Sequence, residues 1–302
     1  MKRFVLALFV VLLFAANAGR TLADPVILTN AIPTLTLSGS VGASTAMNVT
    51  YDPVLQQYYG SSGGYNNSTD FVWSSNGTLL QNASINLDSR AINYNPNTGN
   101  IEDVTFAATF GAPGVYGVFA VGRDGNGLYT GSNAQLLGSA PGLSDSETMP
   151  AYNPTQNVLY APQGNSGTIN VVSDATGNQV GTINLAVPGG VTLNGETLGF
   201  DSFFDVFVDI NAQANEALVF NSSGAYLGAS QLSGIGSALG EYGMGYTNGQ
   251  LFVYDYSTNS WDGFQIFQPA NATPEPATAT LLGMGLLAFG GVMARRRRAM
   301  GA

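Results

Sequence analysis

Carboxylates, amides and hydroxyls are the reactive groups of this chain, because its 302 residues include no histidine and no cysteine. Histidine is the commonest general base and a frequent metal ligand, and Ser-His-Asp and Cys-His nucleophiles both depend on it. Hydrolases of those types are therefore excluded. The catalytic arrangement that the sequence still allows is a pair of carboxylates of the kind that cleaves glycosidic bonds.

The densest group of acidic residues lies in the segment DSFFDVFVDI, which contains Asp201, Asp205 and Asp209. If the segment is one strand, a spacing of four places the three carboxylates on one face. Such a face could bind Ca²⁺ through its oxygen atoms, and we expect no other cofactor. A solvated acidic strand face is the competing interpretation, and it is the one that the sequence favours.

Two weaker candidates are a tyrosine cluster and a glycine-rich loop. The segment QQYYGSSGGY offers Tyr58, Tyr59 and Tyr65, whose rings could contact the faces of sugars. Packing between strands would account for the same residues. Residues 123–127 (RDGNG) hold half of a calcium-loop pattern without its later glutamate, and their Asp-Gly and Asn-Gly pairs favour a plain turn.

The charge of the chain is distributed very unevenly. Residues 24–271 contain 18 of the 19 Asp and Glu residues but only two basic residues, Arg90 and Arg123. A surface this acidic repels phosphate groups, so nucleic-acid binding is excluded. Because there is no disulfide, the body must derive its stability from burial, and about 245 residues suffice for a core.

The elements that hold these residues follow an N-terminal export signal. Residues 1–23 begin with two basic residues and continue with an apolar run and then small residues, which permit cleavage after Ala18 or Ala23. This order predicts a secretory signal peptide. The body that follows, residues 24–270, is rich in Val, Ile, Thr, Tyr and Phe between Asn/Gly/Ser/Asp turns, which predicts an all-β domain.

Internal repetition is the main clue to the architecture of the body. A hairpin with a short polar turn recurs at intervals of 57, 42, 48 and 34 residues, with the turns beginning at Ser74, Gly131, Ser173, Asn221 and Asp255. An aromatic-Asx-Pro turn recurs at residues 51–53, 94–96 and 152–154. Two hairpins per unit predict four-stranded sheets repeating every ~40–50 residues, the period of β-propeller blades.

One segment carries a family resemblance. Residues 159–185, LYAPQGNSGTINVVSDATGNQVGTINL, resemble a blade of the NHL/YVTN-type β-propellers. The resemblance implies a small β-propeller, for which the repeat spacing predicts five or six blades. A two-sheet β-sandwich is the alternative, since loose hairpin repeats occur there too.

The end of the chain has its own pattern. Pro274, Glu275 and Pro276 precede an uncharged run of 18 residues, 277–294, which just meets the length of a transmembrane helix. Four basic residues follow it: Arg295, Arg296, Arg297 and Arg298. By the positive-inside tendency, this basic cluster stays in the cytoplasm and the body lies outside.

This order of motif, apolar run and basic cluster resembles the PEP-CTERM sorting signal of Gram-negative bacteria. The resemblance covers only the tail, residues 271–302, and it requires a signal peptide at the other end. It implies that exosortase, a membrane transpeptidase-like cysteine enzyme, recognises Pro274, Glu275 and Pro276. It also implies a protein held first in the inner membrane and then delivered to the cell surface, outer membrane or extracellular matrix, where such proteins are associated with polysaccharide and biofilm or floc formation.

We therefore expect a non-enzymatic protein with a structural, adhesive or glycan-contacting role. The expected partners are the export machinery, exosortase, the membrane and extracellular polysaccharide. A secreted carbohydrate-active enzyme using paired carboxylates and a calcium-binding scaffold are the alternatives.

Overall fold

The computed structural model describes residues 24–64, 68–107, 117–145, 147–235 and 242–269. The chain divides into two compact units, residues 1–268 and 269–302. The predicted signal peptide, the predicted sorting motif, the apolar run 277–294, the basic cluster and Tyr65 all lie outside the described residues. Within the described ranges, no helix is both long and apolar enough to cross a membrane.

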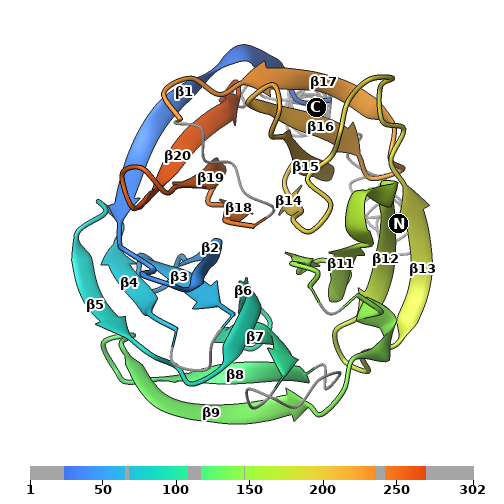
Figure 1. The fold of residues 1–302 in the computed structure, drawn as a ribbon. Helices are drawn as coiled ribbons and strands as arrows, with labels where there is room; N and C mark the ends of the chain where they lie inside the picture. Colours follow the sequence, from blue (N-terminus) through green and yellow to red (C-terminus); the bar gives the residue numbers. More distant parts are fainter. Residues whose placement is uncertain (1–23, 65–67, 108–116, 146, 236–241, 270–302) are drawn as a thin grey trace, which may run out of the picture. The chain divides into compact units, whose positions relative to one another are not determined.

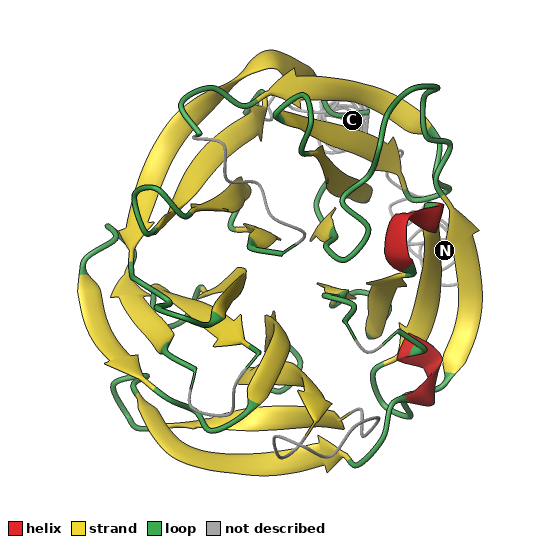
Figure 2. Cartoon of the chain, in the orientation of Figure 1, coloured by secondary structure: helices red, strands yellow, loops and turns green. Residues whose placement is uncertain are grey.

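Four antiparallel sheets of four strands follow one another along the described part of the chain, with two 3-10 turns, η1 (Pro141–Leu143) and η2 (Gly164–Ser166), as its helical pieces (Figure 2). Blade 1 consists of β2 (Thr45–Asp52), β3 (Gln57–Gly63), β4 (Asp70–Ser74) and β5 (Leu79–Ala83). Blade 2 consists of β6 (Asp88–Asn95), β7 (Asn100–Ala107), β8 (Gly117–Arg123) and β9 (Tyr129–Leu137). Blade 3 consists of β10 (Ala151–Asn153), β11 (Val158–Pro162), β12 (Thr168–Ser173) and β13 (Gln179–Asn184), and blade 4 of β14 (Gly199–Asp201), β15 (Val206–Asn211), β16 (Glu216–Asn221) and β17 (Tyr226–Gln231).

The fifth sheet is completed by the first strand of the chain. It contains β18 (Met244–Thr247), β19 (Gln250–Asp255) and β20 (Ser260–Phe267), and β1 (Ile27–Ser38) pairs antiparallel with β20. The pairing runs from Ile27 opposite Phe267 to Ser38 opposite Ser260. β1 also makes one parallel pair with β17, at Asn30 and Gln231, which joins blades 4 and 5 at the rim.

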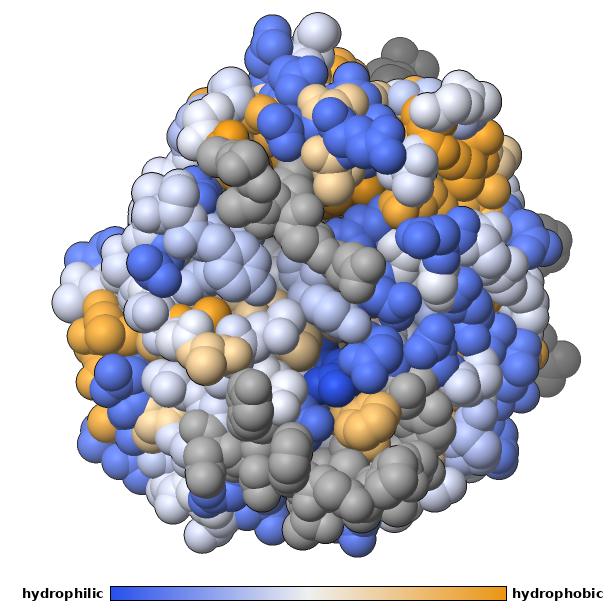
Figure 3. All heavy atoms as spheres, in the orientation of Figure 1, coloured by the Kyte–Doolittle hydropathy of each residue, from blue (hydrophilic) through white to orange (hydrophobic). Residues whose placement is uncertain are grey.

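The sheets stand around a common axis, with β2, β6, β14 and β18 nearest the centre and β5, β9, β13, β17 and β1 at the rim (Figure 1). This arrangement of the described residues is a five-bladed β-propeller, one of the two blade counts that the repeat spacing allowed. It is not the two-sheet sandwich considered as the alternative. The face shown in Figure 3 is mostly hydrophilic, and its hydrophobic residues gather in small groups.

A repeated turn builds the inner hairpin of blades 1 to 4. The side-chain oxygens of Asp52, Asn95, Asn153 and Asp201 accept the backbone N–H two residues later, at 2.8, 2.9, 2.9 and 2.8 Å. Four residues after each of them the chain takes a positive φ of 55–74°, at Gln56, Gly99, Asn157 and Asp205. Three of these turns are the predicted aromatic-Asx-Pro turns, whose Asx side chain replaces a missing backbone acceptor.

The blades pack on one another through large buried side chains. Between blades 5 and 1, Trp73 and Trp261 are fully buried, with ring centroids 5.5 Å apart. Their indole N–H groups donate to backbone carbonyls, Trp73 to Ser38 at 2.9 Å and Trp261 to Met47 at 3.0 Å. Each fully buried side chain of this size contributes about 1.5–3 kcal/mol, so burial replaces the disulfides that a cysteine-free chain lacks.

Candidate functional site

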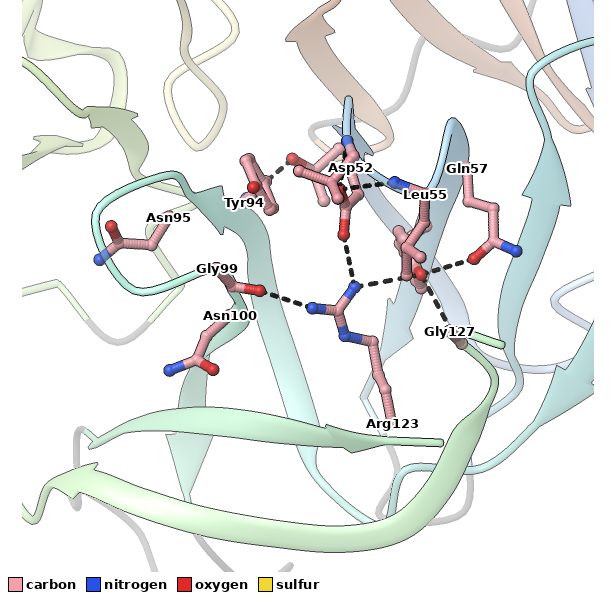
Figure 4. A network of polar contacts seen from close by, with 12 residues as sticks. Asp52, Leu55, Gln57, Tyr94, Asn95, Gly99, Asn100, Arg123 and Gly127 are labelled. Atoms are coloured by element: carbon pink, nitrogen blue, oxygen red, sulfur yellow. Dashed lines mark hydrogen bonds and ion pairs between the residues drawn. The ribbon is translucent and has the colours of Figure 1, made fainter. Parts of the chain in front are cut away.

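A buried ion pair joins blades 1 and 2. Arg123, at the end of β8, places its Nη1 atom 2.7 Å from Asp52 Oδ2 and 3.2 Å from the Tyr59 hydroxyl (Figure 4). Its Nη2 atom donates to Gly99 O at 2.7 Å. The guanidinium also lies over the Tyr59 ring, 5.3 Å from the centroid. One of the two basic residues of the body is therefore used to connect three turns.

The electrostatics of this junction keep Arg123 charged. Burial alone would lower the pKa of Arg123, but its hydrogen bonds to Asp52 and Tyr59 outweigh burial and raise the pKa. Burial raises the pKa of Tyr59, against the opposing effect of Arg123. The neutral Tyr59 hydroxyl donates toward Gln57 Oε1 at 2.7 Å and Gly127 O at 3.0 Å. The phenol thus stays protonated and continues the network into the next turn.

An open depression of about 530 Å³ lies beside this network. It is lined by β8 and β9, by the 124–125 turn, by Leu55 from the turn between β2 and β3, and by Asn100 at the start of β7. Asp124 closes the turn, because its Oδ1 atom accepts the N–H groups of Asn126 at 2.8 Å and Leu128 at 2.9 Å. Residues 123–127 thus form the plain turn that the sequence favoured.

The three acids of the predicted metal site are not on one strand face. Asp201 ends β14, Asp205 occupies the turn, and Asp209 lies in β15, because the segment is a hairpin and not a single strand. Asp201 accepts the Tyr246 hydroxyl at 2.7 Å. Asp209 is 2% exposed, and burial raises its pKa well above the usual range. Among the described residues there is no group of three potential acidic metal ligands.

The predicted sugar-stacking tyrosines are buried as well. Tyr58 and Tyr59 are 1% and 0% exposed. Tyr58 packs against Phe252 with centroids 5.3 Å apart, and its hydroxyl accepts hydrogen bonds from Asn248 at 2.8 Å and Gln250 at 3.3 Å. No ring face of either residue is left for a ligand, which corrects the expectation for these two positions.

Two acids that the sequence did not single out are Glu102, in β7 of blade 2, and Asp174, which follows β12 of blade 3. Glu102 Oε1 accepts hydrogen bonds from Asn95 Nδ2 at 3.0 Å and Thr98 Oγ1 at 3.2 Å. Burial, assisted by the charge of Asp174, raises the pKa of Glu102 to about 7. Burial also raises the pKa of Asp174. The two acids are 72 positions apart in sequence, so no local motif connects them.

Arg90, the second basic residue of the body, forms ion pairs that join two connections between blades. Arg90 in β6 pairs with Asp88 at 2.8 Å and, through Nη2, with Glu147 Oε2 at 3.2 Å. The Tyr242 hydroxyl donates to the same Glu147 oxygen at 3.1 Å. Glu147 belongs to the connection from blade 2 to blade 3, and Tyr242 to the connection from blade 4 to blade 5. Arg90 therefore links segments that are far apart along the chain.

Another carboxylate is a backbone acceptor inside blade 1. Asp70 is 1% exposed and accepts the N–H groups of Ser62 at 3.1 Å and Ile85 at 3.0 Å. Burial raises the pKa of Asp70 to about 8. Its role is to satisfy two backbone donors where the outer strand ends, which is a structural role.

By its fold the body is a small β-propeller, and solved propeller structures are similar to it at low identity. A gluconolactonase from Xanthomonas campestris matches with 11% identity over 82% of this chain and 99% of that one, at a TM-score of 0.46. The β-propeller domain of Cps50 (Swd1) from Myceliophteria thermophila matches with 8% identity over 73% and 83%, at 0.39. A nidogen/laminin complex matches with 15% identity over 74% and 77%, at 0.41. These likenesses concern the fold alone. No curated protein matches the chain.

The tail is where the comparison with families is specific. The PEP-CTERM protein-sorting motif matches residues 272–298. The motif implies an exported protein that is anchored at the membrane and processed by exosortase, and it confirms the resemblance drawn from Pro274, Glu275 and Pro276. The match leaves the activity of the propeller open, because it covers none of the blades.

Proposed function

We propose that this protein is an exosortase substrate whose propeller acts without catalysis in the extracellular polysaccharide matrix, through adhesion or glycan contact. The observation that carries the proposal is the sorting motif at residues 272–298. A body with 18 acidic and two basic residues stays dispersed outside the cell, and amide and hydroxyl side chains suit hydrogen bonds to sugars. Both arginines of the body are already paired with carboxylates.

Processing at the motif is tested by mass spectrometry of the mature C-terminus from the producing cells. We expect the chain to end near Thr273–Pro276, and a Glu275→Ala variant to keep Arg295 to Arg298. A Thr280→Ser variant in the apolar run is the matched control and should be processed normally. An intact tail on the wild-type protein would show a plain membrane anchor and contradict this part of the proposal.

The role in the matrix is tested with the mature protein and the producer's own exopolysaccharide. We expect the protein to sediment with the polymer and to leave its length unchanged. Failure to sediment with the polymer would overturn the glycan-contacting role, while shortening of the polymer would overturn the non-catalytic one.

Polymer cleavage is the second candidate, and Glu102 with Asp174 is the observation that favours it. A glutamic acid with a pKa of about 7 could donate a proton while a nearby carboxylate is ionised. If the polymer is shortened, a Glu102→Gln variant should lose that activity, because the amide cannot donate an acidic proton. Shortening that persists in this variant would exclude the pair as the catalytic acids.

A further inference from the structure

The outer hairpin of blade 2 departs from the pattern of blades 1, 3 and 4. Between the pairs Val121–Asn133 and Arg123–Tyr129, strand β9 carries two residues more than β8. The corresponding hairpins of blades 1, 3 and 4 slip by a single residue. A slip of one residue is thus sufficient for the hairpins of these three blades, and the larger bulge in blade 2 is an addition to that pattern.

This bulge shapes the depression beside Arg123. A Cβ atom on Gly122 would lie 1.8 Å from Ser132 O, so the two strands approach closely where β9 bends. Gly131 has a φ of 73°, which turns the outer strand and exposes Ser132 and Ala134. Small residues thereby line a hollow of about 530 Å³, which lies within the range of about 300–1,000 Å³ found for small-molecule sites.

Hydrogen-bonding groups in the depression remain free of partners within the described part of the chain. The side-chain amide of Asn100 and the hydroxyl of Ser132 form no hydrogen bond there, and Figure 4 shows the Asn100 amide without a contact among the residues drawn. Asp124 uses Oδ1 for its turn. Arg123 uses Nη1 and Nη2, which leaves its Nε group. The depression therefore offers both hydrogen-bond donors and acceptors beside small aliphatic residues.

The charge balance selects the kind of ligand. Asp52 neutralises Arg123 at 2.7 Å, and Asp124 adds a further negative charge. An anionic sugar would be repelled here, whereas a neutral sugar offers hydroxyls that both donate and accept. The lining contains no aromatic ring, so recognition would proceed by hydrogen bonding and not by stacking.

We propose that the depression on blade 2 binds neutral sugar units of the extracellular polysaccharide, with Asn100, Ser132 and Asp124 contacting their hydroxyls. This inference rests on the proposed function and locates it on one blade. The site replaces the buried tyrosines as the place of glycan contact.

The test compares four forms of the mature protein, the wild type and three variants, in affinity electrophoresis and calorimetry. The probes are the intact exopolysaccharide and the neutral and acidic oligosaccharide fractions of its hydrolysate. Ala134→Trp fills the depression from an exposed position, and Val180→Trp places the same ring on the exposed outer strand of blade 3. Thermal melting of each variant verifies its fold.

We expect the wild type and Val180→Trp to bind the neutral fraction, and Ala134→Trp to lose more than about tenfold in affinity. Asn100→Ala, which leaves the depression open, should lose about threefold to tenfold. If Ala134→Trp binds as the wild type does, the site is wrong although the proposed function stands. Binding to the acidic fraction alone overturns the ligand class. If the wild type binds no fraction and no polymer, the proposed function and this inference both fail.

Discussion

Replacing Arg123 by methionine tests whether the junction of blades 1 and 2 depends on its buried ion pair. The paired side chains of Arg123 and Asp52 are 13% and 3% exposed. Removing the cation leaves the Asp52 carboxylate buried without its partner, which typically costs about 3–5 kcal/mol. The hydrogen bond to Gly99 O is lost with it. We expect the free energy of unfolding to fall by about 3–5 kcal/mol.

The assay is urea unfolding followed by the fluorescence of Trp73 and Trp261, which are fully buried in the folded protein. A loss of this size lowers the melting temperature by ~6–20 °C, at about 2–4 °C per kcal/mol for a domain of this length. A second substitution, Asp52→Asn, removes the stranded charge. It keeps an oxygen for the turn, as Asn95 does in blade 2. The double variant should therefore recover most of the lost stability.

The stability of the double variant shows whether the unpaired Asp52 charge or the lost contacts of Arg123 cause the destabilisation. If Arg123→Met costs less than about 1 kcal/mol, the pair behaves like an exposed salt bridge and the reasoning is refuted. If the cost is large but Asp52→Asn does not reduce it, the contacts of the guanidinium with Gly99 O and the Tyr59 ring carry the effect instead.

Three further predictions follow from the same contacts. Because the pKa of Glu102 is raised to about 7 in the folded protein, protonated Glu102 stabilises the fold at low pH. This contribution is lost as the pH rises from about 4.5 to about 7. A Glu102→Gln variant should therefore show a smaller decline of the urea midpoint over this pH range. Gly122→Ala should cost about 1–3 kcal/mol, because its methyl group would meet Ser132 O. Gly125→Ala, with open space around it, should cost less than about 0.5 kcal/mol, and equal losses would contradict the bulge geometry. Added Ca²⁺ should leave the melting temperature unchanged in the wild type and in variants with Asn at Asp201, Asp205 or Asp209. A calcium-dependent rise that these substitutions abolish would instead support the calcium-binding scaffold.

The fold was accessible from the sequence because each blade repeats local chemistry. An Asx residue that bonds the N–H two positions later, followed by a residue with positive φ, defines the inner hairpin. Asp52, Asn95 and Asn153 could be recognised by their neighbouring proline. Asp201 makes the same turn without proline, so the sequence placed it on a strand face, as a solvated acid or, less favoured, as a metal ligand. That interpretation assumed one continuous strand, in which residues four positions apart share a face. The segment is instead a hairpin, so Asp201 and Asp209 lie on two different strands.

The candidate site was less accessible because its contacts are long-range. Arg123 and Asp52 are 71 positions apart, and Glu102 and Asp174 are 72 apart. The one local signal was the scarcity of cations: two arginines among 18 acids must each attract a carboxylate. Packing between strands was one of two interpretations for Tyr58 and Tyr59, but the sequence could not decide between them, since a strand alternates its faces and does not reveal which blades will cover them.

The pairing of β1 with β20 connects the fold to export. Ile27 lies opposite Phe267, and Gln268 donates its N–H to Val26 O at 2.9 Å. The first and last strands of the propeller thus end at the same seam, only a few residues from the predicted signal peptide and from the sorting motif that begins at 272. Because β1 is made first and β20 last, a chain that is exported unfolded cannot complete its fifth blade until residue 267 has crossed the membrane. We therefore expect ring closure to follow export of the whole body, and a chain truncated before β20 to remain protease-sensitive even after its other four blades have formed.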